Sequence, residues 1–375
     1  MKKEKRNKKL KILIGIFSVI LIICCVLLFI EIFSKASPIK GKYSKEVITV
    51  LDNNNLLDKA NKLDYSPTLE IMIKDDYFNK KHFDDYYLVD YHEYEGFSKH
   101  VSQLLEKEYE PEKINYLMSN QTKELINKII TLDKFEIDYL KIKDFDLDKL
   151  ARYKEFNSYV LSFEEIVKAV NHDIDIKKDE VPYDSANFYI NIKPAIDPHS
   201  DITLVNKAYV LDKSFVPNDL VNFESKSISK RVVEPLKEMF EYAKEAGYHL
   251  CTISSYRSYN TQTSLFYGYI KRDGRAHAER YSAKPGHSEH QLGLATDLCT
   301  TNGKRITVDS PVYPWLENNA HKFGFIIRFP KGKTGITGYN FEPWHVRYIG
   351  KEHATKVKEL DITYDEYYEI FLKER

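Results

Sequence analysis

Cysteine is scarce in this sequence, because the 375 residues contain only four. Cys24 and Cys25 lie inside an apolar segment, which leaves Cys251 and Cys299 for the rest of the chain. Two cysteines are too few for the disulfide framework that holds small secreted domains together. They either form one bridge or remain buried thiols, and both alternatives stay open.

Glycine is nearly absent from the first two thirds of the chain. Eleven of the fourteen glycines lie at or after Gly247, and only Gly41 and Gly96 occur between the apolar segment and that point. Glycine is needed where the backbone turns tightly or approaches a ligand closely. The distribution therefore predicts that the chemistry of this protein lies in the last third of the chain.

The chain also lacks net charge, with 56 basic and 56 acidic residues, but the balance is uneven. Residues 1–11, MKKEKRNKKLK, carry seven of the basic residues and one of the acidic ones, which leaves 49 basic against 55 acidic residues in the remainder. Because the positive charge is confined to one short leader, no basic surface for nucleic acid is expected.

Long hydrophobic runs are absent except directly after this leader. Residues 12–30, ILIGIFSVILIICCVLLFI, contain no charge and are just long enough to cross a membrane as a helix. We therefore predict a cytoplasmic leader at 1–11, a transmembrane anchor at 12–33 and an extracellular C-terminal part. A cleaved signal peptide is the alternative, although its apolar region is usually shorter than this run.

Residues 34–195 are rich in Lys, Asp, Glu, Tyr and Ile. Apolar residues recur there at helical spacing, for example Ile114, Leu117, Ile126 and Ile129. Neither a convincing repeat period nor a catalytic constellation is evident. We predict a mostly helical stalk or spacer domain; the alternative is a module that contacts the cell wall or positions substrate.

Residues 196–375 alternate between helix and strand signals without a regular βαβ period. This pattern predicts an α+β fold with a small antiparallel or mixed sheet and flanking helices. Strands are expected at 248–254, 294–299, 325–329 and 341–348, and helices near 232–243, 261–271, 315–323 and the C-terminus.

Two clusters in this region carry residues suited to metal chemistry. The first is Ser288-Glu289-His290-Gln291-Leu292-Gly293-Leu294-Ala295-Thr296-Asp297, and the second is Glu342-Pro343-Trp344-His345. A catalytic zinc site uses three protein ligands and leaves one coordination position open. His290, Asp297 and His345 supply such a set, and Glu342 remains as a base close to the metal. Each residue alone is a weak signal, since a single histidine is more often structural and Asp297 alone could cap a turn.

The frame S-x-H-x-x-G-x-A-x-D, followed by E-P-W-H, resembles the VanY-type D-alanyl-D-alanine carboxypeptidases, which share a zinc fold with LD-carboxypeptidases, lysostaphin-type peptidases and hedgehog domains. The resemblance covers about residues 200–350. It also includes Ser254-Ser255-Tyr256-Arg257-Ser258, Lys284-Pro285-Gly286-His287, Gly324-Phe325-Ile326-Ile327-Arg328-Phe329-Pro330 and Thr337-Gly338-Tyr339.

The resemblance implies one zinc ion bound by His290, Asp297 and His345, with Glu342 as general base. It implies that Arg257 meets the substrate carbonyl, and that Gln262 and Ser288 line the pocket for the terminal D-amino acid. Trp344 either shields the metal or packs, and it is included among the residues expected to bind substrate.

The predicted function is a zinc-dependent carboxypeptidase that removes the C-terminal D-alanine from peptidoglycan stem peptides outside the cell. LD-carboxypeptidase and endopeptidase activities are alternatives, because the zinc motif is common to all three. A non-catalytic, zinc-stabilised wall-binding module is an alternative of another class. The presence of Glu342 disfavours it, since a structural zinc needs no free base.

Overall fold

The computed structural model describes residues 41–156, 158–176 and 180–373. The chain divides into two compact units, one up to Lys141 and one from Ile142 onward. Residues 142–195, which the sequence pattern assigns to the spacer, therefore pack with the second unit. The predicted leader and anchor lie outside the described residues. Within the described ranges, no helix is long and apolar enough to cross a membrane.

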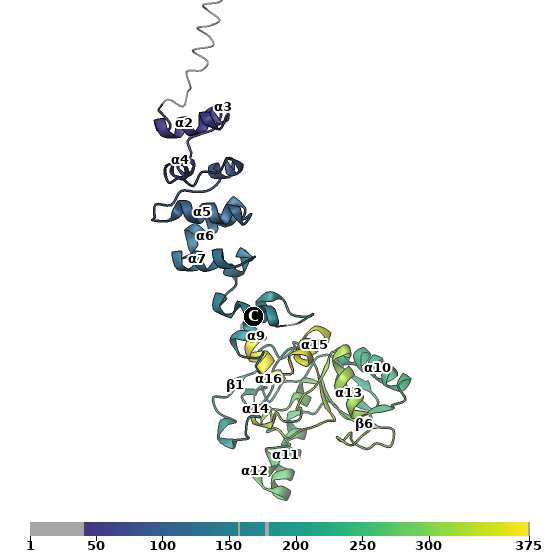
Figure 1. Ribbon diagram of the computed structural model, residues 1–375. Coiled ribbons are helices and arrows are strands. Elements are labelled where there is room, and N and C mark those ends of the chain that lie inside the picture. The colour runs from purple at the N-terminus through teal and green to yellow at the C-terminus, as the bar shows by residue number, and fades with distance from the viewer. Residues whose placement is uncertain (1–40, 157, 177–179, 374–375) are drawn as a thin grey trace, which may run out of the picture. The chain divides into compact units, whose positions relative to one another are not determined.

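The first unit, called the repeat module below, covers described residues 41–141 and consists of short helices joined by tight turns (Figure 1). This agrees with the helical prediction for the region, and the expected apolar positions Ile114, Leu117, Ile126 and Ile129 are buried. Its elements are α2 (Lys45–Asn53), α3 (Leu57–Asn61), α4 (Pro67–Lys74), η1 (Lys80–His82), η2 (Asp85–Tyr87), α5 (Phe97–Glu106), α6 (Pro111–Asn120), α7 (Lys123–Thr131) and η3 (Ile137–Lys141).

Three helices of the module end in the same way. A polar residue with positive φ follows the helix and an apolar residue follows it in turn: the pairs are Asn55-Leu56, Asp76-Tyr77 and Glu108-Tyr109. In each pair the amide of the apolar residue donates to the carbonyl five residues earlier, over 2.8, 2.9 and 3.1 Å respectively. This is the six-to-one bond of a Schellman ending, which satisfies the last carbonyl groups of a helix.

Side-chain contacts between successive turns of the module recur at similar separations, from 20 to 27 residues. The hydroxyl of Tyr109 donates to the carbonyl of Phe135, 26 residues later, and Lys107 donates to the carbonyl of Leu132, 25 residues later. Asn115 and Leu88 are 27 residues apart. The module is therefore a repeat of roughly 25 residues, in which each unit contacts its neighbours. What recurs is a helix ending and a similar contact spacing rather than residue identity, which is why the sequence itself shows no convincing repeat period.

The second unit contains helices, two two-stranded sheets and a four-stranded sheet. Its elements before the four-stranded sheet are η4 (Leu147–Lys149), α8 (Leu150–Glu155), α9 (Phe163–Asn171), η5 (Ser185–Asn187), β1 (Lys193–Pro194), β2 (Tyr209–Val210), β3 (Leu220–Phe223), β4 (Lys226–Ser229) and α10 (Lys230–Glu245). The rest are β5 (Leu250–Ser254), α11 (Tyr259–Asp273), α12 (Arg275–Ala278), η6 (Glu289–Leu292), β6 (Ala295–Thr300), α13 (Tyr313–Asn319), η7 (Ala320–Phe323), β7 (Phe325–Ile327), α14 (Thr334–Thr337), β8 (His345–Tyr348), α15 (Lys351–Leu360), α16 (Tyr364–Tyr367) and η8 (Tyr368–Leu372).

The four-stranded sheet has the order β5-β6-β8-β7, and every neighbouring pair is antiparallel. The four predicted strands therefore form one sheet, and the α+β class with flanking helices is confirmed. Central strand β6 pairs Asp297 with Ser254 on one side and with His345 on the other. This register places two predicted metal ligands opposite each other across adjacent strands.

Because side chains alternate along each strand, the core residues and the site residues lie on opposite faces of the sheet. Leu298 and Val346 belong to a buried cluster with Leu236 and Met239 of α10. Successive strand residues point to opposite faces of a sheet, so Asp297 and His345 face away from this cluster. The buried apolar face thus holds the strands in register, while the other face carries the polar side chains.

Cys251 and Cys299 face each other on β5 and β6 and form a disulfide. The pairing resolves the alternatives that the sequence left open. Cys299 lies two residues after Asp297, so the bridge fixes the neighbouring part of the strand that carries this carboxylate.

Candidate metal centre and substrate pocket

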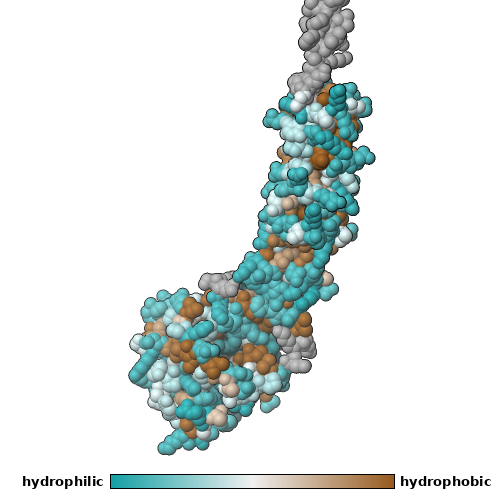
Figure 2. Space-filling model, turned by 90° about the vertical axis from the view of Figure 1, so that its left-hand side faces the viewer, coloured by the Kyte–Doolittle hydropathy of each residue, from teal (hydrophilic) through white to brown (hydrophobic). Residues whose placement is uncertain are grey.

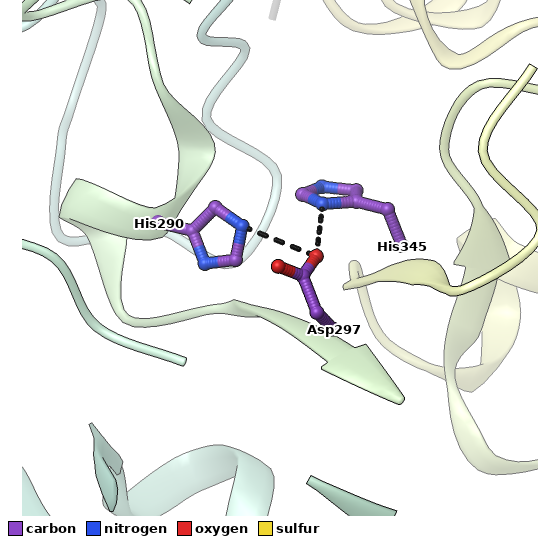
Figure 3. A group of neighbouring side chains, drawn as sticks. All are labelled: His290, Asp297 and His345. Atoms are coloured by element: carbon purple, nitrogen blue, oxygen red, sulfur yellow. Dashed lines mark hydrogen bonds and ion pairs between the residues drawn. The ribbon is translucent and has the colours of Figure 1, made fainter. Parts of the chain in front are cut away.

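His290, Asp297 and His345 converge in the second unit (Figure 3). One potential ligand atom of each side chain lies within 4.8 Å of the other two, and all three residues are buried. The Nε2 atom of His290 is 3.4 Å from Oδ1 of Asp297, and Nδ1 of His345 is 3.0 Å from the same oxygen. In the described ranges this is the one group of three such residues.

His290 is held by the short helix η6 and by the glycine that ends it. Gly293 has a φ of 70° there, and an added Cβ would lie 3.1 Å from a side-chain atom of Leu220 and 3.2 Å from the amide nitrogen of Ser229. Only glycine fits this turn without strain. The segment between His290 and Asp297 therefore consists of one tight turn and the start of β6.

The hydrogen bond on the far side of His290 determines which nitrogen faces the centre. Its Nδ1 lies 2.6 Å from the carbonyl oxygen of Ser255, an atom that only accepts, so Nδ1 carries the proton. Burial, with the nearby charge of Arg257, lowers the pKa of His290 to about 4, which keeps the ring neutral. The lone pair of Nε2 therefore faces a carboxylate oxygen, and a cation between these two acceptors satisfies both.

His345 has a different environment. Burial opposes its charge, but the contacts with Asp297 and Glu289 raise the pKa of His345 to about 9. Its outer Nε2 is 3.6 Å from Oε2 of Glu289, and neither atom has a hydrogen-bond partner in the described structure.

Two imidazoles and one carboxylate are a donor set of catalytic zinc sites, which leave a position open for water or substrate. Asp297 also accepts a 2.6 Å bond from Nη2 of Arg257 through Oδ2, so Oδ1 is left toward the two histidines. A carboxylate with its outer oxygen held in this way is fixed in orientation. The residues therefore fit zinc.

Glu342 lies directly before β8. Its amide donates to the carbonyl of Phe329 over 3.0 Å, and its own carbonyl accepts from the amide of His345 over 3.2 Å. Burial raises the pKa of Glu342 to about 7, although the charge of His345 opposes this. A carboxylate with a pKa near neutrality is suited to take up and return a proton.

A pocket of about 240 Å³ contains the centre. All eight residues predicted from the sequence line it, namely Arg257, Gln262, Ser288, His290, Asp297, Glu342, Trp344 and His345. Gln262 is only 2% exposed and donates to the carbonyl of Ala283 over 2.8 Å, while its Oε1 has no protein partner. Gln262 thus presents a free acceptor at a largely closed part of the pocket.

The prediction omitted a buried charge cluster beneath the centre. Oε1 of Glu289 accepts from Nε of Arg328 at 2.7 Å and from Nη1 of Arg347 at 3.0 Å. Arg328 also pairs with Asp365 at 2.6 Å. Burial disfavours the charged form of Glu289, but the two guanidinium groups hold its pKa well below the usual range.

The sequence did contain a signal for this cluster. Arg347 lies in strand β8 between Val346 and Tyr348, and Arg328 directly follows β7, between Ile327 and Phe329, so both have apolar neighbours. Charged residues in such positions require a buried partner. Glu289, inside the histidine motif, is that partner.

The sheet, the His-Asp-His group and the neighbouring buried glutamate together define a zinc-dependent peptide hydrolase. A family model described as VanY, D-alanyl-D-alanine carboxypeptidase, matches residues 225–351. The chain is 41% identical over 190 residues to the putative carboxypeptidase YodJ of Bacillus subtilis, an alignment that covers 46% of this chain and 68% of YodJ. The chain belongs to the VanY family of zinc carboxypeptidases.

Other relatives differ in how much of their length is matched. The bifunctional D-Ala-D-Ala dipeptidase and carboxypeptidase VanXYC of Enterococcus gallinarum is 30% identical over 181 residues, with 45% of this chain and 93% of VanXYC covered. The D-alanyl-D-alanine carboxypeptidase of Enterococcus faecalis is 39% identical over 149 residues, with 37% of this chain and 55% of the relative covered. The solved structure of the LdcB LD-carboxypeptidase has a TM-score of 0.45 at 37% identity and covers 48% of this chain and 91% of its own.

Proposed function

We propose that this chain removes the C-terminal D-alanine from peptidoglycan stem peptides that end in D-Ala-D-Ala. The observation that carries the proposal is the buried Glu342 beside the His-Asp-His group in one pocket. Ligands alone indicate a metal, whereas a base next to them indicates hydrolysis. The D-Ala-D-Ala activities for which VanXYC and the Enterococcus faecalis relative are named support the choice of this substrate.

The residues of the pocket have separate roles in hydrolysis. Zinc in such a site acts as a Lewis acid that polarises the scissile carbonyl and makes the attacking water more acidic. Glu342 accepts the proton of that water and returns it to the leaving amine. Arg257 is held by Ser254 at 2.8 Å and by Asp297 at 2.6 Å, and its remaining donors stabilise the developing oxyanion.

The polar end of the pocket suits the terminal residue of the substrate. Gln262 and Ser288 are buried there; the hydroxyl of Ser288 is a donor for a terminal carboxylate, and the unpartnered Oε1 of Gln262 is an acceptor for an N–H of the peptide. An exopeptidase has to recognise a free C-terminus, for which arginine and short polar groups are suitable. These contacts favour a peptide end over an internal bond, and so a carboxypeptidase over an endopeptidase.

We place the enzyme on the outer side of the cell membrane, with the anchor at residues 12–33 and the N-terminus in the cytoplasm. The disulfide between Cys251 and Cys299 supports this location, because such bonds persist in oxidising compartments. The apolar segment next to a lysine-rich leader supports it as well. In this arrangement residues 34–195 act as the spacer between membrane and catalytic unit.

The test is to incubate the chain, with zinc, with stem pentapeptide and tetrapeptide and to measure released D-alanine. Release from the pentapeptide is expected, with a loss of roughly 10²–10⁴-fold in the Glu342→Ala variant. Release from the tetrapeptide alone would assign LD-carboxypeptidase activity instead. Full activity after chelation of zinc, or in the Glu342→Ala variant, would refute the mechanism, and no cleavage of any peptide would leave the wall-binding alternative.

A further inference from the structure

Arg305 is a cation in the wall of the pocket that the proposed mechanism does not use. It lies on the loop between β6 and α13, is exposed, and pairs with Cys299 by a single β-bridge. Its guanidinium carbon is 4.7 Å from the centre of the Trp344 ring, which holds the side chain at the pocket wall. Within the described parts of the chain, Arg305 forms no ion pair, whereas Arg257 in the same pocket is paired with Asp297.

The sheet register separates Arg305 from the polar end of the pocket. Strand β5 runs antiparallel to β6, so that Ser254 lies beside Asp297 and Cys251 beside Cys299. The chain that continues from Ser254 to Gln262 therefore leaves the sheet at the Asp297 end, while Arg305 contacts the Cys299 end. Asp297, and with it the metal centre, lies between the two.

This arrangement assigns a direction to the bound peptide. The terminal residue enters the buried part near Gln262 and Ser288, and the scissile carbonyl lies at the metal centre. The residues on the amino side of that bond must leave through the exposed part of the pocket, where Arg305 and Trp344 are located. An unpaired guanidinium at this position faces the part of the substrate that precedes the cleaved bond.

We infer that Arg305 is a specificity-determining residue that binds a free carboxylate on the amino side of the scissile bond. A guanidinium that lies over an aromatic ring presents a fork of donors that matches a carboxylate. The substrate class is therefore a stem peptide whose preceding residues carry an unamidated carboxylate. This inference rests on the proposed function, since it takes the orientation of the peptide from it.

A general electrostatic role is the competing explanation. The charge of Arg305 also lowers the pKa of Glu342, although burial has the larger, opposite effect. A role through Glu342, or through the packing of Trp344, changes the cleavage of every peptide by the same factor. A contact with a substrate carboxylate changes only the ratio between peptides with and without that carboxylate.

The experiment compares two peptides that both end in D-Ala-D-Ala and differ in one group. One carries a free carboxylate in the residue before the terminal dipeptide, and in the other this group is amidated. Dissociation constants are measured by calorimetry on zinc-loaded protein in the Glu342→Ala background, and kcat/KM is measured with Glu342 present. The free carboxylate is expected to improve both constants about fivefold, as a well-placed exposed ion pair does.

Variants of Arg305 and Lys304 then test which side chain causes the preference for the peptide with the free carboxylate. Arg305→Gln is expected to reduce the ratio between the two peptides to about one, and Arg305→Lys to keep part of it. Lys304→Gln removes the same charge from the neighbouring position, which does not line the pocket, and is expected to leave the ratio unchanged. An unchanged ratio in Arg305→Gln, or no preference in the unmodified chain, overturns the inference. Absence of D-alanine release refutes the proposed function separately, because the binding ratio does not require turnover.

Discussion

The repeat module and the catalytic unit are built from contacts of different range. In the module, most side-chain hydrogen bonds between turns connect residues 20–27 positions apart, as for Ser66 with Tyr86 and His100 with Asn127. At the metal centre, the contacts span 40 positions for Arg257 with Asp297, 48 for His345 with Asp297 and 58 for Arg347 with Glu289. The module can therefore form one neighbour at a time, whereas the site exists only after the whole sheet has assembled.

The ion pairs of the two regions also differ in how exposed their side chains are. A typical pair of the module, Lys59 with Asp84, has side chains that are 51% and 67% exposed, and such pairs contribute little. The pair of Arg328 with Glu289 is 0% and 2% exposed. Removing one member of a buried pair leaves an uncompensated charge, which is strongly destabilising. The face of the module visible in Figure 2 is mainly hydrophilic, with scattered apolar residues, in keeping with a solvated spacer.

The largest expected effect is the loss of metal from the long-range site. Asp297→Ala removes the ligand that the two histidines share and leaves Arg257 without its partner. Zinc affinity is expected to fall by more than about 100-fold, since even changes to the groups behind a ligand cost 10- to 100-fold. Competition with a chromogenic chelator measures this. Retention of one tightly bound zinc ion in the variant would contradict the assigned ligand set.

The next effect tests the buried charge cluster. Glu289→Gln leaves Arg328 and Arg347 with less compensating charge, and the free energy of unfolding of the catalytic unit is expected to fall by about 3–5 kcal/mol. Denaturant unfolding measures the change. Glu241→Gln is the matched control, because its pair with Lys244 is exposed, and a change within about 0.5 kcal/mol is expected there. Equal changes in the two variants would show that burial does not distinguish the pairs.

The pH dependence of catalysis tests the environment of Glu342. The general base acts as a carboxylate, so kcat/KM is expected to fall about tenfold for each pH unit below its pKa. Burial raises that pKa to about 7 in the metal-free chain, and the charge of bound zinc lowers it again. The acid limb should therefore lie between the ordinary value for glutamate and pH 7. It is measured at saturating zinc, and a profile that stays flat from about pH 4 to pH 8 would exclude Glu342 as the base.

The smallest effect concerns the repeated helix endings. Glu108 has a φ of 63°, a conformation that costs a residue with a side chain about 1 kcal/mol more than glycine. Glu108→Gly is therefore expected to stabilise the module by about 0.5–1 kcal/mol in urea unfolding. Lys99→Gly, at an exposed position inside α5, is expected to destabilise it by about 1 kcal/mol. The same sign for both substitutions would refute the role of the left-handed position.

The metal ligands could be predicted because they lie in short sequence motifs. His290 and Asp297 are separated by one glycine turn, and Glu342 and His345 by a single tight segment, so their spacing is determined locally. The strands could be predicted for a similar reason, since β6 is a short run of mainly small and apolar residues that follows Gly293.

The rest depended on three-dimensional context. The partner of Glu289 lies 39 or 58 positions away, and one sequence does not show which buried arginine meets which acid. The bridge between Cys251 and Cys299 required the register of β5 and β6. The repeat is not visible in the sequence because Asn55, Asp76 and Glu108 share a backbone conformation rather than a side chain.

The Schellman endings of the module have a consequence for how its gene can change. Each helix ends through bonds within its own turn, and each turn meets the next at a separation of roughly 25 residues. Duplication or in-frame loss of one such unit recreates the same junction between the units that remain. The module can thus lengthen or shorten in whole steps without any change in the residues of the metal-binding unit.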